Sequence, residues 1–255
     1  MTVAEANQNV DDLAGYRRRI CVEPAPGAVL AMLEDDIHCM AVILRHDGEK
    51  VLAVEAVTQR MPWDTCPGAA AKLVETFVDQ PLSKVTARRE KKANCTHLHD
   101  LAVLAAAHAL DSEPTTYDLF ATDPVGGQRI LEIRRDGETV HRWIEQDGTF
   151  AAPAAVAGLT LLGMRDWIGS LEGAEQETAR MLQWASLVAH GRTMPIEEQS
   201  AAADLPPNCY TFQPERAASA HRVGDRFDFS DGTRVLLEGF GDRMRAQLKQ
   251  GPTSV

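Results

Sequence analysis

The sequence predicts an α+β fold in which antiparallel β-hairpins pack against helices, arranged as two related halves. Three features predict this fold, and each occurs once in each half: two β-rich runs around an Asp-Gly dipeptide, a proline followed by small residues, and a largely apolar helical segment. We interpret this repeated order as a degenerate internal duplication. A chance similarity between two Asp-Gly hairpins is the alternative interpretation.

The strands of the two halves are expected as hairpins over residues 40–55 and 129–145. Their turns are the Asp-Gly dipeptides at positions 47–48 and 136–137. Asp-Gly between β-rich runs favours a two-residue turn, because both of its residues tolerate positive φ.

Helices are expected after each hairpin. Pro67 and Pro153 mark the helix starts, because the first helical position needs no backbone N–H. A second helix closes each half, over residues 96–110 and 174–190.

The pattern divides the chain into three parts. Residues 1–112 form the first α+β half, and residues 113–192 form the second, degenerate half. Residues 193–255 are expected to be a linker and a C-terminal hairpin around the dipeptide 231–232, which completes the second half.

Composition limits the partners and the compartment. The chain has 255 residues, with 37 Asp and Glu against 26 Lys and Arg and a formal net charge of −11. An acidic chain lacks the basic surface that nucleic-acid binding needs, so we expect no nucleic-acid partner. No run approaches the roughly 18 apolar residues of a membrane span, so we expect no membrane partner. Five cysteines without CxxC spacing and an N-terminus unlike a signal peptide favour the cytoplasm.

The first candidate site lies on the first predicted hairpin. A two-residue turn places Met40 opposite Glu55 and His38 opposite Val57, so that His38 and Glu55 become diagonal neighbours on an apolar face. A carboxylate in apolar surroundings has a raised pKa, and a neighbouring imidazole can share its proton. We therefore predict an acid/base pair, with a buried structural hydrogen bond as the alternative.

The second candidate site lies on the helix expected over residues 96–110. His97 and Asp100 share one helix face, so a hydrogen bond between them can fix the imidazole tautomer. The helix dipole favours the neutral form of His97 near the N-terminus. The pattern predicts proton transfer, and a satisfied core histidine is the alternative.

Four further residues are predicted to bind the substrate. Met61 and Trp63 make an apolar, aromatic corner that can wall a pocket. Cys66 and Cys95 lie just before helix starts, where a thiolate is stabilised. Core packing is the alternative for all four.

The first part of the chain resembles a bacterial family known only as domain of unknown function 2889. The resemblance rests on these segments in order: Ile37-His38, Val54-Glu55-Ala56, Pro62-x-x-x-Cys66-Pro67, Arg88 and Cys95-Thr96-His97-Leu98-x-Asp100-Leu101. It implies a bacterial protein with a small, hydrophobic catabolic substrate. It also groups the candidate residues in one motif set, which adds Arg88 to the predicted substrate-binding residues.

We expect an enzyme, of the lyase or isomerase type, that uses no cofactor and no metal. The sequence has no GxGxxG, Walker, HExxH, GxSxG or EF-hand motif, which leaves acid/base chemistry by His38, Glu55, His97 and Asp100 on an aromatic catabolic substrate. One specific version is carbon–carbon cleavage of a hydroxymethyl-bearing, lignin-derived dimer with release of formaldehyde. We also expect a homodimer. The alternatives are a metal-dependent enzyme with the same four residues as ligands, and a non-catalytic small-molecule-binding protein.

Overall fold

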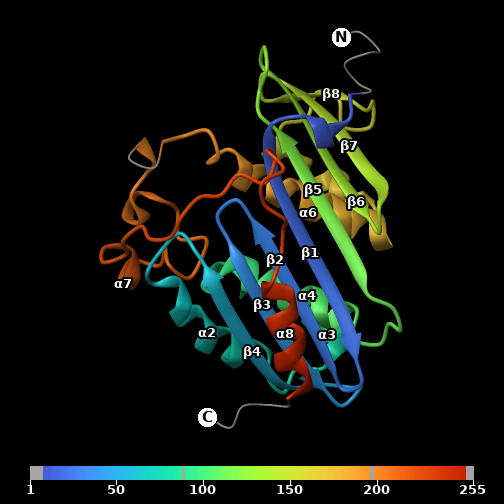
Figure 1. Ribbon diagram of the computed structural model, residues 1–255, viewed down its shortest axis with the longest axis vertical. Helices are drawn as coiled ribbons and strands as arrows, with labels where there is room; N and C mark the ends of the chain where they lie inside the picture. The colour runs from blue at the N-terminus through green and yellow to red at the C-terminus, as the bar shows by residue number, and fades with distance from the viewer. Residues whose placement is uncertain (1–7, 88–89, 196–197, 251–255) are drawn as a thin grey trace. The chain divides into compact units, whose positions relative to one another are not determined.

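The computed structural model describes residues 8–87, 90–195 and 198–250 and has the α+β fold that the sequence predicts (Figure 1). The strands of its antiparallel sheet follow the order β4-β3-β2-β1-β5-β6-β7-β8. They are β1 (Gly15–Ala25), β2 (Ala28–Asp35), β3 (Cys39–His46), β4 (Val51–Arg60), β5 (Thr115–Thr122), β6 (Gln128–Arg135), β7 (Glu138–Gln146) and β8 (Thr149–Ala152). The α-helices are α2 (Ala69–Phe77), α3 (Leu82–Val85), α4 (Thr96–Ala107), α5 (Arg165–Ser170), α6 (Gly173–Ala189), α7 (Pro214–Ala217) and α8 (Phe240–Lys249). No helix in the described part of the chain is both long and apolar enough to cross a membrane.

The chain divides into two compact units. Among the described residues, unit 1 contains those up to 19 together with 116–199 and 228–235, and unit 2 contains 20–115, 200–227 and those from 236 on. The sequence interpretation attached residues 193–255 to the second half. The structure instead groups much of that segment with unit 2, because α8 packs on the sheet of that unit. The internal duplication stays a prediction.

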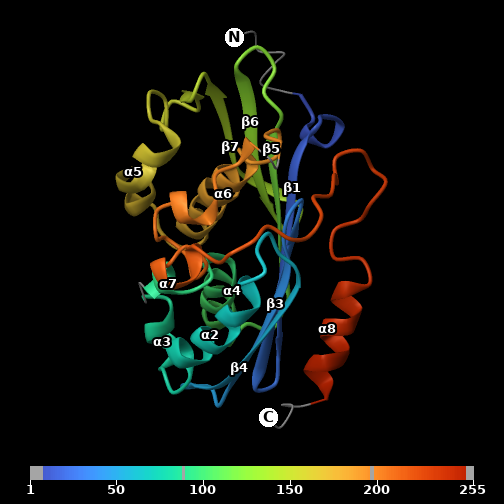
Figure 2. The same ribbon diagram turned by 90° about the vertical axis from the view of Figure 1, so that its left-hand side faces the viewer.

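Unit 2 has three layers. Helices α2, α3 and α4 cover one face of its strands, and α8 covers the other (Figure 2). All eight residues of β2 are buried, as a strand covered on both faces requires.

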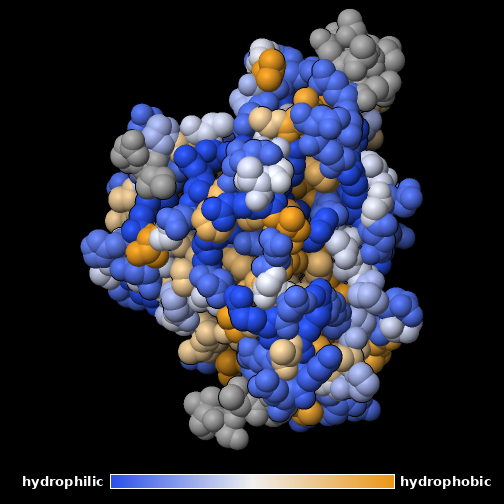
Figure 3. Space-filling model, viewed as in Figure 1, coloured by the Kyte–Doolittle hydropathy of each residue, from blue (hydrophilic) through white to orange (hydrophobic). Residues whose placement is uncertain are grey.

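Helix α8 is amphipathic and was not predicted. Phe240 and Met244 are buried against an apolar patch on β2 and β3 that includes Met32 and Ile43. The outward side of α8 is largely hydrophilic (Figure 3). This polarity is what a helix needs to seal one face of a sheet.

The hairpin over residues 129–145 is confirmed as β6 and β7. Arg135 pairs with Glu138, which leaves the two-residue turn expected for Asp136-Gly137. Both turn residues have positive φ, 52° and 88°.

The hairpin over residues 40–55 is confirmed as β3 and β4, but its predicted register is wrong. His46 pairs with Val51, so the loop has four residues and not two. Asp47 explains the longer loop, because its Oδ1 accepts hydrogen bonds from the backbone N–H groups of Glu49 and Lys50 at 2.9 and 2.8 Å.

The predicted C-terminal hairpin is not formed. The described residues 226–235 contain no strand. The Oδ1 atom of Asp231 instead accepts hydrogen bonds from the backbone N–H and the hydroxyl of Thr233 at 2.9 and 2.7 Å, which closes a local turn.

Unit 1 contains β5 to β8 with α5 and α6, and its core is aromatic. Trp143 and Phe150 are fully buried and meet edge to face with ring centroids 5.5 Å apart. Tyr117 is buried too, and its hydroxyl donates to Glu177 of α6 at 2.6 Å. None of the described residues of the predicted site lies in this unit.

Candidate active site

The site begins at the turn between β2 and β3 in unit 2. Asp35 ends β2, and His38 immediately precedes β3. The Oδ1 atom of Asp35 accepts hydrogen bonds from the backbone N–H groups of Ile37 and His38, at 2.8 and 2.7 Å. The backbone N–H of Asp35 donates to the carbonyl of His38 at 2.8 Å. These bonds fix the turn and the carboxylate together.

The carboxylate of Asp35 orients the imidazole of His38. Their side chains are almost completely buried, and Nδ1 of His38 lies 3.1 Å from Oδ1 and 3.3 Å from Oδ2. An ionised carboxylate can only accept hydrogen bonds, so Nδ1 of His38 is the donor in this contact. Nε2 is left as the nitrogen that can exchange a proton with a substrate.

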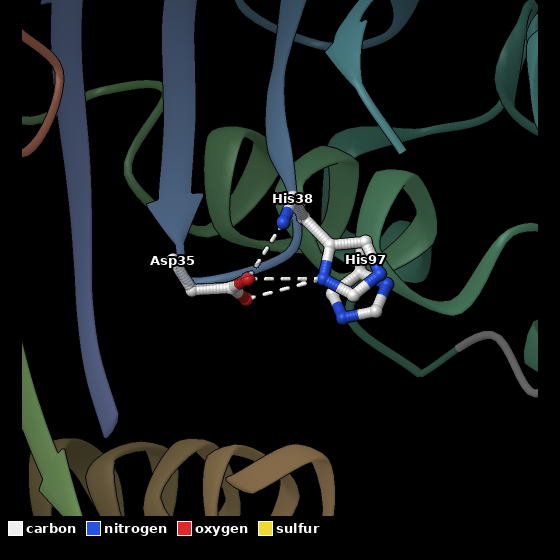
Figure 4. Close-up of side chains that lie close together, drawn as sticks. All are labelled: Asp35, His38 and His97. Carbon is white, nitrogen blue, oxygen red and sulfur yellow. Dashed lines mark hydrogen bonds and ion pairs between the residues drawn. The ribbon is translucent and has the colours of Figure 1, made fainter. Parts of the chain in front are cut away.

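His97 is the third member of the site. It lies in the first turn of α4, which packs against β2 and β3. The rings of His38 and His97 stack with centroids 3.8 Å apart and planes inclined by 31° (Figure 4). His97 is only partly buried, so it is the more accessible of the two imidazoles.

The same three side chains have the composition of a metal site. One ligand atom from each of Asp35, His38 and His97 lies within 4.8 Å of the other two. Two imidazoles and one carboxylate suit divalent zinc, iron, cobalt or nickel.

Glu55 does not join His38. It pairs with Ile43 in the sheet, its carboxylate forms an ion pair with Arg45 at 2.9 Å, and it also accepts from Gln247 of α8. The prediction paired Glu55 with Met40, three residues before its actual partner Ile43. Side chains alternate between the two faces of a sheet, so a shift by an odd number of residues places Glu55 and His38 on opposite faces. Glu55 consequently faces α8, as its contact with Gln247 shows. Helices α8 and α4 cover opposite faces of the strands (Figure 2).

Asp100 does not orient His97 as predicted. Its carboxylate forms an ion pair with Lys91, and the histidine beside it is His99, whose Nδ1 lies 3.8 Å away. Burial opposes ionisation of Asp100, but Lys91 and His99 together outweigh it and hold the pKa of the carboxyl below its ordinary value. The metal alternative based on Glu55 and Asp100 therefore lacks two of its four ligands.

Trp63 and Cys66 lie in an apolar cluster of unit 2 with Ala202 and Ala217, and Met61 packs against it. Trp63 also meets Phe212 edge to face, with centroids 5.9 Å apart. These contacts are those of core anchors. A substrate-binding role for Met61, Trp63 and Cys66 stays a prediction.

Burial disfavours the thiolate form of Cys66 and Cys95. Burial raises the pKa of the Cys66 thiol, and burial together with the neighbouring Cys66 raises the pKa of Cys95 to about 12. Cys95 is the N-cap residue of α4, two positions before His97. Arg88 lies outside the described residues.

Sequence reasoning missed Asp35. The available signal was the acidic run 34–36 between two apolar runs, since Asp commonly accepts backbone hydrogen bonds from residues two and three positions later. His38 is three positions after Asp35, so this rule predicts the hydrogen bond between them.

The site falls within a segment that matches a known family. Residues 26–110 match the model of the family "Protein of unknown function (DUF2889)", as the sequence resemblance predicts. This DUF2889 match contains Asp35, His38 and His97 but none of the C-terminal segment of unit 2. No curated protein and no solved structure matches the chain.

Proposed function

We propose that the protein is an enzyme of the lyase or isomerase type that works by general acid/base catalysis on a small hydrophobic, aromatic compound. The observation that carries the proposal is the hydrogen bond of Asp35 to His38 beside the stacked ring of His97. A carboxylate-oriented imidazole next to a second imidazole provides two groups that can donate and accept protons. This chemistry needs no organic cofactor.

The two imidazoles have different roles in this proposal. The Asp35 carboxylate contacts Nδ1 of His38 and leaves its Nε2 for reaction with a substrate. We assign His38 as the acid, and the more accessible His97 as the base.

A retro-aldol cleavage illustrates the roles. His97 removes the hydroxyl proton of a hydroxymethyl group, and the carbon–carbon bond breaks to release formaldehyde. The electron pair of that bond passes to the remaining carbon, which takes a proton from Nε2 of His38. The proton on His97 then returns to His38 directly or through water, and the site is restored.

The test is turnover of hydroxymethyl-bearing aromatic compounds with formaldehyde as the measured product. We expect His38→Ala and His97→Ala to lose turnover while remaining folded. His108→Ala is the matched control, because His108 is a buried histidine at the other end of α4 that bonds Asp111 at 2.7 Å. Equal turnover in wild type and both site variants contradicts the proposal. Binding of these compounds without conversion favours the non-catalytic alternative.

A metal-dependent enzyme is the second candidate, with Asp35, His38 and His97 as ligands. The proximity of their ligand atoms, all within 4.8 Å of one another, favours it. Elemental analysis of protein purified without a metal-affinity step separates the candidates. A stoichiometric metal that is lost in Asp35→Ala and His97→Ala, with activity restored by that metal after chelation, supports the second candidate over the first.

We further propose that the protein is a cytoplasmic homodimer that binds neither nucleic acid nor a membrane surface. The formal net charge of −11 supports the absence of these partners, since both surfaces are anionic. Light scattering coupled to gel filtration tests the dimer, and a monomer mass contradicts it.

A further inference from the structure

Arg60, at the end of β4, contacts the turn that carries Asp35. One guanidinium nitrogen, Nη2, donates to the backbone carbonyl of Asp35 at 2.8 Å and to the Glu34 carboxylate at 2.9 Å. Arg60 and Glu34 are 7% and 8% exposed, so this charge pair is held out of water. The bond to the carbonyl attaches Arg60 to the residue that orients His38.

The C-terminal segment holds the other side of the same turn. The centroid of the Phe227 ring lies 4.2 Å from the guanidinium carbon of Arg60. The backbone N–H of Phe227 donates to the carbonyl of Asp36 at 2.7 Å. The backbone N–H of Leu237 donates to the second carboxylate oxygen of Glu34. Residues 34, 35 and 36 are thus each bonded from outside the turn, by Arg60 or by the C-terminal segment.

Stability alone does not account for this arrangement. Replacing a buried ion pair by apolar side chains is often neutral or stabilising, because burial of the charges costs free energy. A second Arg–Glu pair in the same unit, Arg45 with Glu55, also has a 2.9 Å contact but lies away from Asp35. The difference between the pairs is that Arg60 bonds the backbone of a site residue.

We propose that Arg60 is a positioning residue, and that Arg60 and Phe227 together hold the Asp35 carboxylate in the place where it fixes the Nδ1–H tautomer of His38. The inference rests on the proposed function, because the Nδ1–H tautomer matters for catalysis only if His38 transfers protons. The tautomer itself can be measured without a substrate. Failure of the inference is therefore distinguishable from failure of the proposed function, which depends on turnover.

The experiment is long-range ¹H–¹⁵N NMR of histidine-labelled protein, assigned with His38→Gln. We expect Nδ1–H for His38 in the wild type and loss of this single tautomer in Arg60→Gln. Arg60→Lys should retain part of the Nδ1–H signal, because a lysine ammonium can donate to either the Asp35 carbonyl or the Glu34 carboxylate. Arg45→Gln is the control and should leave the His38 signals unchanged.

Phe227→Leu keeps the proposal testable if Arg60→Gln does not fold. This variant retains the backbone N–H bond and removes the aromatic contact with Arg60, so we expect a mixed His38 tautomer in a folded protein. A wild-type His38 spectrum in folded Arg60→Gln, or in Phe227→Leu where Arg60→Gln is unfolded, overturns the inference. An equal change in Arg45→Gln also overturns it, because the effect would then belong to any Arg–Glu pair of the sheet.

Discussion

The imidazole of His38 stacks on the imidazole of His97 with ring centroids 3.8 Å apart. The first residue precedes a strand, and the second begins a helix that packs on that strand. Nδ1 of His38 lies 3.1 Å from the Asp35 carboxylate, and His97 is the more exposed of the two rings.

Replacing His97 separates chemistry from structure. His97→Ala should lower turnover by about 10²- to 10⁴-fold, the range for one acid/base group. The free energy of unfolding should change little, because His97 is only partly buried. The control His108→Ala should behave in the opposite way, with a loss of about 0.5–3 kcal/mol of stability and normal turnover per folded molecule. Denaturant unfolding and formaldehyde release measure the two quantities. A destabilised His97→Ala with normal turnover would identify His97 as a core contact.

Replacing Asp35 by asparagine should reverse the tautomer of His38. The amide oxygen can keep the backbone bonds of the turn, and the amide nitrogen then donates towards Nδ1 of His38. His38 is left with its proton on Nε2, and turnover should fall by about 10²- to 10⁴-fold. Histidine ¹⁵N spectra of the folded variant give the tautomer. Retention of Nδ1–H in Asp35→Asn counts against the proposed role of the carboxylate.

His46 should make the protein less stable as the pH falls. Burial lowers the pKa of His46 from its ordinary value of 6.5, and its Nδ1 accepts the Gly48 N–H at 3.1 Å. The unfolded chain therefore binds more protons below pH 6.5, so stability is present above that pH and is lost as the pH falls towards the folded pKa. Urea unfolding at pH 7.5 and 5.5 should show a smaller difference for His46→Gln than for wild type. The exposed His221→Gln is the control, and an equal slope in all three proteins refutes the assignment.

Helix α8 should contribute strongly to stability through its apolar side. Phe240 is 3% exposed and packs on the patch that includes Met32 and Ile43. Phe240→Ala should cost about 3–5 kcal/mol, as expected for a buried aromatic residue. Lys249→Ala, on the exposed end of the same helix, should change stability by less than about 0.5 kcal/mol. Similar unfolding midpoints for the two variants would show that α8 is not part of the core.

Local features of the sequence predicted much of the fold. The hairpins over residues 40–55 and 129–145, and helices α4 and α6, follow from turn dipeptides and apolar periodicity, which act over a few residues. The register of β3 and β4 did not follow, because side-chain hydrogen bonds of Asp47 lengthen the loop beyond the dipeptide. The strand β1, which is not bounded by an Asp-Gly turn, was missed as well.

The candidate site was predicted in part. His38 and His97 were named from local patterns, but their contact depends on how α4 packs on the sheet, which is a relationship between distant parts of the chain. The partner carboxylates were assigned to Glu55 and Asp100, because the wrong register and the helix spacing favoured them. The carboxylate beside His38 belongs to Asp35, where a hydrogen-bonded turn outweighs both patterns.

The bonds from Phe227 and Leu237 to the turn have a consequence for the order of events during synthesis. All three site residues lie in the segment 26–110, and that segment leaves the ribosome well before residue 237 is added. Domains begin to fold while the chain is still growing. Until the later residues arrive, the Glu34 carboxylate and the Asp36 carbonyl depend on water for these two bonds. In the nascent protein, the local bonds of Asp35 to Ile37 and His38 can therefore form before the residues on either side of Asp35 gain their bonds to Phe227 and Leu237.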